Sequence, residues 1–209
     1  MNLVIIGTGG LAREVFDLAI LCYKNDTDFK IKGFIADEPM AMYVDKYPPY
    51  LGKIEDYQLN NNDRFFCAIG NIRSRKKCVD IILDKGGEFI NIVAPGVFVS
   101  PNAKIGKGVV IKWDCVLNSG VEIGDFTYIQ ANVLFGHDVK VGSFCQISSM
   151  SFFAGGVQIA DFVDINPGVR IIQNIKIGRC AKVGIGSVVV SNVKPETTVW
   201  GFPAKKLVY

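Results

Sequence analysis

The sequence has one histidine in 209 residues, His137. Zinc sites built on two or three histidines are therefore excluded, because the chain cannot supply the ligands. A cysteine–histidine nucleophile pair would have to use this same residue, and nothing in the cysteine pattern favours one. The six cysteines include no CxxC pair and no spacing typical of a disulfide framework. Cysteine usage of this kind favours a reducing, cytoplasmic compartment.

Long apolar runs and a strong charge are also missing. No stretch reaches the ~18 apolar residues of a membrane span. The opening MNLVIIGTGG lacks the basic start and the longer apolar core of a signal peptide. The net charge of +3 is too small to favour nucleic acid or a membrane surface as a partner. With 49% hydrophobic and 21% charged residues, the chain is typical of a packed globular protein.

What the sequence does contain is a repeat of six residues. From Val93 to Val189 every sixth residue is a bulky aliphatic residue or Phe, which gives seventeen such positions in a row. Four residues after the large residue, from Val109 onward, stands a small or β-branched residue. A glycine or alanine follows the large residue directly once in every eighteen residues, at Gly106, Gly124, Gly142, Ala160 and Gly178.

A period of six fits neither an α-helix nor a simple β-strand. It predicts a parallel β-helix, in which six residues form one face and eighteen close a triangular coil. The large residue would fill the interior and the small one the corner, and the recurring glycine would support the backbone geometry of the turn. The 102 residues from Val93 to Lys194 then make almost six coils.

The N-terminal part follows a different pattern. Strands are expected at residues 3–6, 30–35 and 65–69, and helices at 11–23 and 73–85. Alternation of strands and helices predicts a small parallel α/β unit. We place the boundary at Gly86-Gly87, which gives domains 1–86 and 87–209. The segment from Trp200 to Lys205 is expected to form a turn beyond the last coil.

The first strand is followed by a glycine loop. The pattern Gly7-x-Gly9-x-x-Ala12 opens a helix and fits a dinucleotide fingerprint, with the acidic pair Asp37-Glu38 after the second strand. Free N–H groups at such a helix start bind phosphate. Because the unit is half the size of a full dinucleotide fold, a mononucleotide is the better-sized ligand. The alternative is that the glycines only allow a tight turn.

A second basic feature lies on the helix at 73–85. The run Arg73-x-Arg75-Lys76-Lys77 is most often a solvated helix face. Arg75 follows Gly70-Asn71 closely, so its guanidinium could also reach a phosphate bound at the glycine loop.

The sole histidine has a carboxylate beside it. His137 follows Phe135 by two residues, so its side chain points outward at a coil edge. A lone exposed histidine is usually inert, but Asp138 can orient the imidazole and stabilise its charged form, as a general base requires. Cys115 and Cys145 occupy the small interior position and are expected to fill the core.

Taken together, these features resemble the bacterial sugar N- and O-acetyltransferases of the NeuD/PglD type, within the hexapeptide acyltransferases. The resemblance covers nearly the whole chain. It implies a Rossmann-like N-terminal unit, a left-handed parallel β-helix and a homotrimer with active sites between subunits, without a metal. The segments that carry it are Val4–Gly10, Ile35–Glu38, Ala68–Asn71, Gly136–Asp138, Ala154–Gly156 and Gly201–Lys205.

The resemblance also assigns residues. It makes His137 the general base and Asp138 the residue that tunes it, and a backbone N–H near Gly155-Gly156 would hold the oxyanion. Many relatives have a histidine where this chain has Leu11, near the sugar, and some have a histidine where this chain has Gln146, near the cofactor. Substrate binding falls to Gly9, Gly10, Leu11, Asp37, Glu38, Gly70 and Arg75, and acetyl-CoA binding to Gln146, Gly155, Gly156, Pro167 and Ile185.

The implied function is acetyl-CoA-dependent N-acetylation of a nucleotide-linked amino-dideoxysugar, in the biosynthesis of lipopolysaccharide or another bacterial surface glycan. Three alternatives stay open. The first is an O-acetyltransferase of the sialic acid type, and the second is a non-catalytic β-helix scaffold. The third and weakest is a nicotinamide oxidoreductase, which the glycine loop alone suggests.

Overall fold

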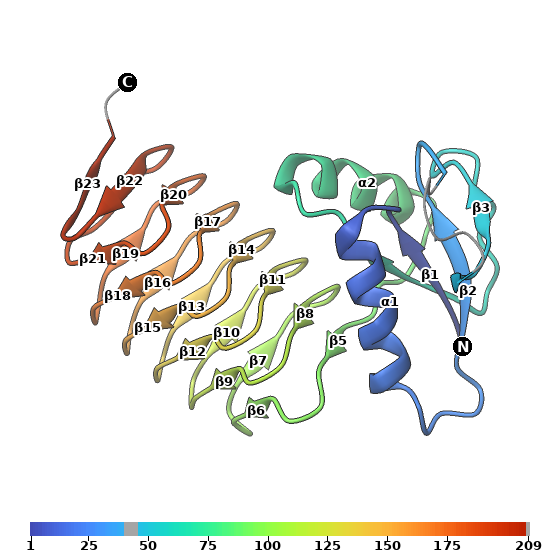
Figure 1. The fold of residues 1–209 in the computed structure, drawn as a ribbon, viewed down its shortest axis with the longest axis horizontal. Coiled ribbons are helices and arrows are strands. Elements are labelled where there is room, and N and C mark those ends of the chain that lie inside the picture. The colour runs from blue at the N-terminus through green and yellow to red at the C-terminus, as the bar shows by residue number, and fades with distance from the viewer. Residues whose placement is uncertain (40–45, 208–209) are drawn as a thin grey trace. The chain divides into compact units, whose positions relative to one another are not determined.

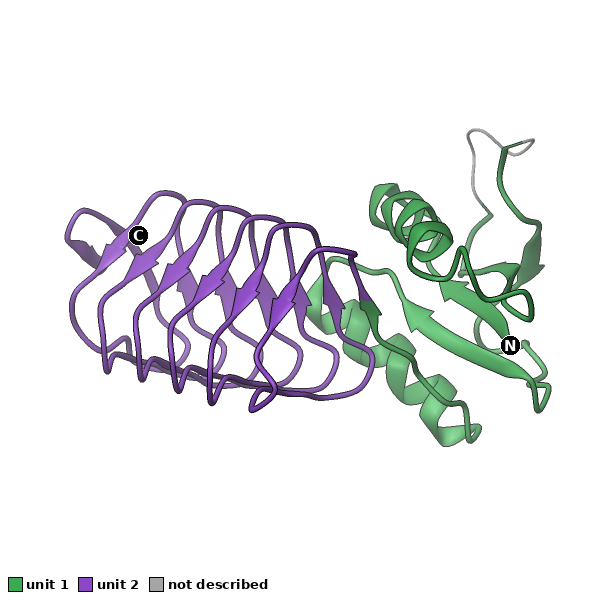
Figure 2. Ribbon diagram, turned by 90° about the horizontal axis from the view of Figure 1, so that it is seen from below, with its two compact units in different colours: residues 1–92 green, residues 93–209 purple. Residues whose placement is uncertain are grey.

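The computed structural model describes residues 1–39 and 46–207. The chain divides into two compact units, Met1–Ile92 and Val93–Tyr209, which Figure 2 draws in different colours. The first is an α/β unit and the second a parallel β-helix, so the expected fold class is confirmed. Within the described residues, no helix is long and apolar enough to cross a membrane.

The α/β unit is built on a parallel sheet (Figure 1). Within the described residues its strands are β1 (Asn2–Ile6), β2 (Lys30–Ile35), β3 (Tyr50–Gly52) and β4 (Asp63–Cys67), in the order β3-β2-β1-β4. Every pairing in this sheet is parallel. The edge strand β3 was not predicted, because three half-exposed residues show no alternation of apolar and polar side chains.

Two helices complete this unit. Helix α1 (Gly10–Cys22) buries Ala12, Val15, Leu18 and Ala19, the spacing of one face of an α-helix. Helix α2 (Ile72–Asp84) buries Arg75, Cys78, Val79 and Ile82 in the same way. Both helices and the three longer strands lie within a few residues of the positions predicted from the sequence.

The β-helix has three sheets, each named here by a feature of its strands. The charged sheet consists of β7 (Lys104–Ile105), β10 (Glu122–Ile123), β13 (Lys140–Val141), β16 (Gln158–Ile159) and β19 (Lys176–Ile177). The apolar sheet consists of β6 (Phe98–Val99), β9 (Val116–Leu117), β12 (Leu134–Phe135), β15 (Phe152–Phe153), β18 (Arg170–Ile171) and β21 (Val188–Val189). The long sheet consists of β5 (Ile92–Val93), β8 (Val110–Ile111), β11 (Tyr128–Ile129), β14 (Gln146–Ile147), β17 (Asp164–Ile165), β20 (Lys182–Val183), β22 (Thr198–Gly201) and β23 (Ala204–Lys206).

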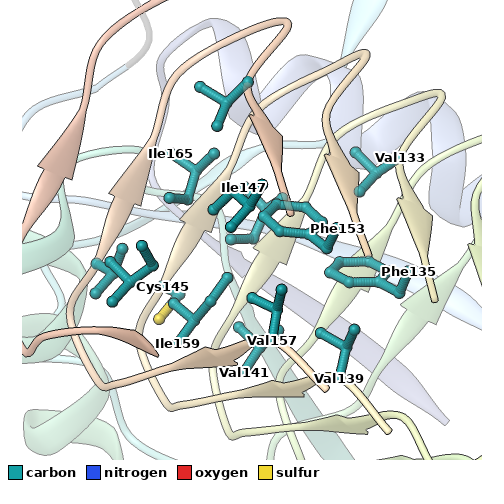
Figure 3. Close-up of a cluster of buried hydrophobic side chains, with 14 of the residues drawn as sticks. Val133, Phe135, Val139, Val141, Cys145, Ile147, Phe153, Val157, Ile159 and Ile165 are labelled. Carbon is teal, nitrogen blue, oxygen red and sulfur yellow. The ribbon is translucent and has the colours of Figure 1, made fainter. Parts of the chain in front are cut away.

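One coil of the β-helix is eighteen residues long. Glu122 pairs with Lys140, and Leu134 pairs with Phe152, one coil further on. The large residues of the hexads fill the interior, where Phe135 and Phe153 stack with ring centroids 5.0 Å apart (Figure 3). The small residue four positions later is buried too, as Cys145 is in Figure 3. The predicted interior is therefore confirmed.

The role expected for the recurring glycines needs correction. Gly124 and Gly142 do not have left-handed backbones. They make room between coils, because a Cβ on Gly124 would lie 2.5 Å from the carbonyl carbon of Gly142. The left-handed backbone belongs to the position two residues later, which Gly108, Phe126 and Phe144 occupy in successive coils.

The C-terminal segment also differs from the prediction. The predicted turn is present at Phe202-Pro203, but the residues on either side of it pair as a hairpin of β22 and β23. Strand β22 continues the long sheet by pairing in parallel with β20. The Trp200 ring lies over Gly184, where a Cβ would come within 2.7 Å of it. The indole N–H donates to the Ile185 carbonyl at 3.1 Å. The hairpin therefore covers the last coil.

Candidate active site

The histidine and its neighbouring carboxylate form a hydrogen-bonded pair. His137 Nδ1 lies 2.9 Å from Asp138 Oδ2, and both side chains are largely exposed, at 74% and 70%. They stand in the turn after β12, at the corner where the chain leaves the apolar sheet. The outward orientation predicted for His137 is confirmed.

This contact decides which ring nitrogen can act as a base. An ionised carboxylate only accepts hydrogen bonds, so the proton of a neutral imidazole must sit on Nδ1 to bond Asp138. The lone pair then remains on Nε2. The hydrogen bond to Asp138 therefore fixes Nε2 as the basic nitrogen of the ring, as in an oriented general base.

Gly155 lies beside that nitrogen, one coil further on. A Cβ on Gly155 would come within 2.4 Å of His137 Nε2, so the imidazole occupies space that any other residue would fill. The Gly155 N–H donates to no group among the described residues, whereas the Gly156 N–H donates to the His137 carbonyl at 2.9 Å. Of the two amides expected to face an oxyanion, Gly155 is the one with a free hydrogen.

The residues expected to bind acetyl-CoA lie at two corners of the β-helix. Gly155 and Gly156 share the corner of His137, in the turn after β15. Pro167 and Ile185 lie in the turns after β17 and β20, at the corner of the long sheet, and Gln146 lies on β14 of that sheet. Both Pro167 and Ile185 are exposed, Ile185 by 64%. One chain does not bring these two sets together.

The outer face of the apolar sheet was not predicted from the sequence. Phe98, Leu134 and Phe152 are 54%, 39% and 41% exposed on it, each directly before an interior residue. The same position on the charged sheet holds Lys104, Glu122, Lys140, Gln158 and Lys176. Sorting that position by sheet, every eighteen residues, would have revealed the difference.

In the α/β unit, the residues expected to bind the nucleotide sugar gather at one edge. Gly9 and Gly10 follow β1, Asp37 and Glu38 follow β2, and Gly70 follows β4. Carboxyl ends of neighbouring parallel strands share an edge, and the crossing from β3 to β4 makes the β1–β4 junction a topological switch point. Gly7 N–H donates to the Ile35 carbonyl at 2.8 Å, which ties the glycine loop to β2. These five residues are exposed, and Leu11, the next residue of the glycine loop, is half-buried.

The two helix starts at this edge differ. Gly9 is the N-cap of α1 and no side chain caps it, and the N–H groups of Gly10 and Leu11 donate to nothing among the described residues. At the start of α2, Asn71 Oδ1 accepts from the Ser74 N–H at 3.0 Å. The start of α1 is therefore the one open to an anion.

Arg75 is not where the sequence placed it. The residue is completely buried, while Arg73 and Lys77 are exposed. The solvated face predicted for Arg75 is therefore wrong, because the residue shares the inward face of α2 with Cys78, Val79 and Ile82. A contact with a bound phosphate would require the guanidinium to leave this position.

The cysteines have structural roles. Cys115 and Cys145 are buried, and their thiols donate to the carbonyls of Gln130 at 3.0 Å and Ala160 at 3.1 Å. Burial raises the pKa of the Cys115 thiol to about 11, which leaves little thiolate for nucleophilic attack. Both residues fill the core as predicted. The described residues contain no cluster of three His, Cys, Asp or Glu side chains able to hold a metal ion.

Two family models match the chain, one on each unit. The PglD N-terminal domain matches residues 2–82, and the GMPPB C-terminal domain matches residues 90–171. The acetyltransferase domain of PglB from Neisseria gonorrhoeae FA1090 is 26% identical with a TM-score of 0.89, and the match covers 99% of each chain. Over its full length the chain is therefore similar to the PglD-type hexapeptide acetyltransferases.

A second member of this group is similar over the full length. PerB from Caulobacter crescentus, solved in complex with CoA and GDP-perosamine, is 28% identical with a TM-score of 0.89, and the match covers 100% of this chain and 98% of that one. Serine acetyltransferase from Escherichia coli (strain K12) is 34% identical over 109 residues, or 52% of this chain. The chain spans only 24% to 37% of the length of the first curated relatives it matches.

Proposed function

We propose that the protein transfers an acetyl group from acetyl-CoA to the amine of a nucleotide-linked amino-dideoxysugar. The observation that carries the proposal is the His137–Asp138 pair, whose Nε2 lies against Gly155, a residue without a side chain whose N–H donates to no described group. A base and an oxyanion donor at one point are the two groups that acyl transfer needs.

The reaction follows from these positions. The sugar nitrogen attacks the thioester carbon while His137 Nε2 takes a proton from that nitrogen. The carbonyl oxygen gains the negative charge and is held by the Gly155 N–H. The intermediate then collapses, the carbon–sulfur bond breaks, and the imidazolium returns its proton to the CoA thiolate. Asp138 keeps the ring in the reactive tautomer and stabilises its cation.

The α/β unit supplies the second half of the proposal. We assign nucleotide-sugar binding to residues 1–86 and acetyl transfer to residues 87–209. The open start of α1 suits the nucleotide phosphates, and Asp37 or Glu38 suits a ribose hydroxyl. Support comes from the match to the PglD N-terminal domain and from the GDP-perosamine bound to PerB. The sugar product would serve bacterial surface-glycan synthesis in the cytoplasm.

A homotrimer would complete the site. Within one chain, Gly155 and the pair Pro167 and Ile185 lie at different corners, so a second copy must supply one of the two sets. The exposed Phe98, Leu134 and Phe152 give the apolar sheet an outer face suited to association. Wild type should sediment as a trimer, and Phe152→Arg should shift it toward monomer and lower turnover. A wild-type monomer that turns over would overturn this assembly.

The function is tested by thiol release from acetyl-CoA with UDP-, GDP- and dTDP-linked amino-dideoxysugars, with free sialic acid included. Turnover on one amino sugar supports N-acetylation and identifies the nucleotide. Turnover on sialic acid alone would replace the proposal with O-acetylation. Release on no acceptor, together with no binding of CoA, would favour a scaffold.

A further inference from the structure

The carboxylate of Asp138 occupies space that a side chain would otherwise take. Gly120 stands one coil before it, and a Cβ on Gly120 would lie 2.3 Å from Asp138 Oδ1. The other carboxylate oxygen, Oδ2, bonds His137 Nδ1 at 2.9 Å. Oδ1 therefore lies in the space that the missing side chain of Gly120 leaves, and Oδ2 is held by the imidazole.

The backbone at this corner is fixed as well. Asp138 has a left-handed backbone with φ 59°, and its N–H donates to the carbonyl of Ser119 at 2.9 Å. Gly120 has φ 75° in the same position of the preceding coil. The main chain therefore holds Asp138 directly over Gly120, and only the direction of the carboxylate remains adjustable.

The geometry points to Gly120 as a positioning residue for the general base, an inference that rests on the proposed function. Because Gly120 has no side chain, the Asp138 carboxylate can lie flat over the preceding coil and hold His137 in its Nδ1–H tautomer. Any side chain at position 120 turns the carboxylate away and leaves the tautomer unselected.

Gly120→Ala carries the left-handed strain of about 1 kcal/mol that any alanine with this backbone carries. The remaining cost falls on the His137–Asp138 pair. An added Cβ meets the free end of a flexible side chain at 2.3 Å, while the Asp138 Cγ and Cα lie at 3.4 Å and 3.5 Å. A rotation of the carboxylate relieves the contact without moving backbone. The same rotation moves Oδ2 away from Nδ1.

The test uses the fact that His137 is the only histidine. Nitrogen NMR of imidazole distinguishes the Nδ1–H and Nε2–H tautomers, and one histidine gives one unambiguous pair of signals. Spectra of the full chain are recorded under alkaline conditions, in which imidazole is neutral. We expect wild type to be mostly Nδ1–H, and Gly120→Ala to fall to the tautomer ratio of Asp138→Ala.

The matched control is Gly108→Ala. Gly108 has a similar left-handed backbone, with φ 66°, and an added Cβ there would also meet a side chain, the Phe126 ring at 2.4 Å. It lies at a different corner, so the tautomer ratio should stay that of wild type. An equal shift of the tautomer ratio in both variants would mean that any added methyl group disturbs the packing between coils, and it would overturn the proposal.

Kinetics give an independent readout. Gly120→Ala should lower kcat/KM by about tenfold, part of the ~10²–10⁴-fold that a general base supplies. In an Asp138→Ala background, Gly120→Ala should change kcat/KM by less than about twofold, since no carboxylate is left to displace. A further tenfold loss there would contradict the positioning role.

A second variant covers the case in which Gly120→Ala folds poorly. Asn174 adopts a left-handed backbone at the same corner three coils further on, with φ 61°, and Asn132 does so at the corner after the long sheet, with φ 60°. Gly120→Asn therefore adds a Cβ that the backbone accepts, and it should shift the tautomer as Gly120→Ala does. An unchanged Nδ1–H signal in a folded variant overturns the inference. Because this signal needs no substrate, it is independent of failure of the proposed reaction.

Discussion

Two corners of the β-helix share one backbone conformation and use it differently. At the corner after the charged sheet, Phe126, Phe144 and Phe162 follow one another in successive coils, with ring centroids 5.0 Å and 5.4 Å apart. At the corner after the apolar sheet, Gly120, Asp138 and Gly156 alternate instead. All six residues have left-handed backbones.

The side chains at the two corners therefore have different roles: those at one corner stabilise the coils, and those at the other carry the proposed chemistry. A column of like side chains stacks and stabilises each coil against the next, at about 0.5–1.5 kcal/mol for each aromatic pair. At the Phe162 end of the stack, the Arg179 guanidinium lies 4.8 Å from the ring centroid and makes a cation–π contact. A column interrupted by glycine leaves space on both sides of a polar residue, and that space orients it. The repeated aromatic column is part of the scaffold, whereas the interrupted column carries the proposed general base pair.

The largest expected effect is a loss of activity without a loss of stability. His137→Ala should lower kcat/KM by about 10²–10⁴-fold, since it removes the base. Unfolding free energy should change by less than about 0.5 kcal/mol, because the side chain is 74% exposed. Kinetics and chemical denaturation of the same preparation measure both quantities. A loss of tenfold or less would remove the base assignment.

The opposite result is expected at the other corner. Phe144 is 8% exposed and stacks on two rings, so Phe144→Ala should destabilise the fold by about 3–5 kcal/mol. Well below its melting temperature, the variant should keep the kcat/KM of wild type and the Nδ1–H signal of His137. A selective loss of activity in folded Phe144→Ala would show that the two corners are not independent.

The sequence predicts the scaffold better than the contacts between coils. Interior residues such as Phe135 and Ile147 follow from a period of six, because each must be buried whatever its neighbours are. The outward position of His137 follows from the same register. The place of the Asp138 carboxylate over Gly120 does not, because it depends on two residues eighteen apart and on a side-chain rotamer.

Arg75 shows a second limit of sequence reasoning. A basic run on a helix predicts a solvated face, and Arg73 and Lys77 are exposed as predicted. Arg75 is three residues before Cys78 and four before Val79, so helical periodicity alone places it with the buried residues. Residue type and periodicity disagree at this position, and the tertiary structure follows the periodicity.

A third experiment sharpens the comparison with a glycine whose backbone is not left-handed. Gly155→Ala places a methyl group within 2.4 Å of His137 Nε2 without backbone strain. The imidazole must move away from the oxyanion donor, so kcat/KM should fall by about tenfold or more. Stability should change by less than about 1 kcal/mol, as denaturation curves will show. Wild-type kinetics in this variant would mean that Nε2 does not act at Gly155.

The smallest expected effect concerns Gly108, the glycine that packs against the first ring of the aromatic stack. Gly186 and Gly108 have φ 67° and 66°, but an added Cβ meets nothing within 4 Å at Gly186 and the Phe126 ring at 2.4 Å at Gly108. Gly186→Ala should therefore cost only the left-handed strain, about 1 kcal/mol. Gly108→Ala should cost at least about 1 kcal/mol more, because the first ring of the stack must shift. Equal unfolding free energies for the two variants would mean that the ring yields freely, and the stack would then contribute little to the stability of this corner.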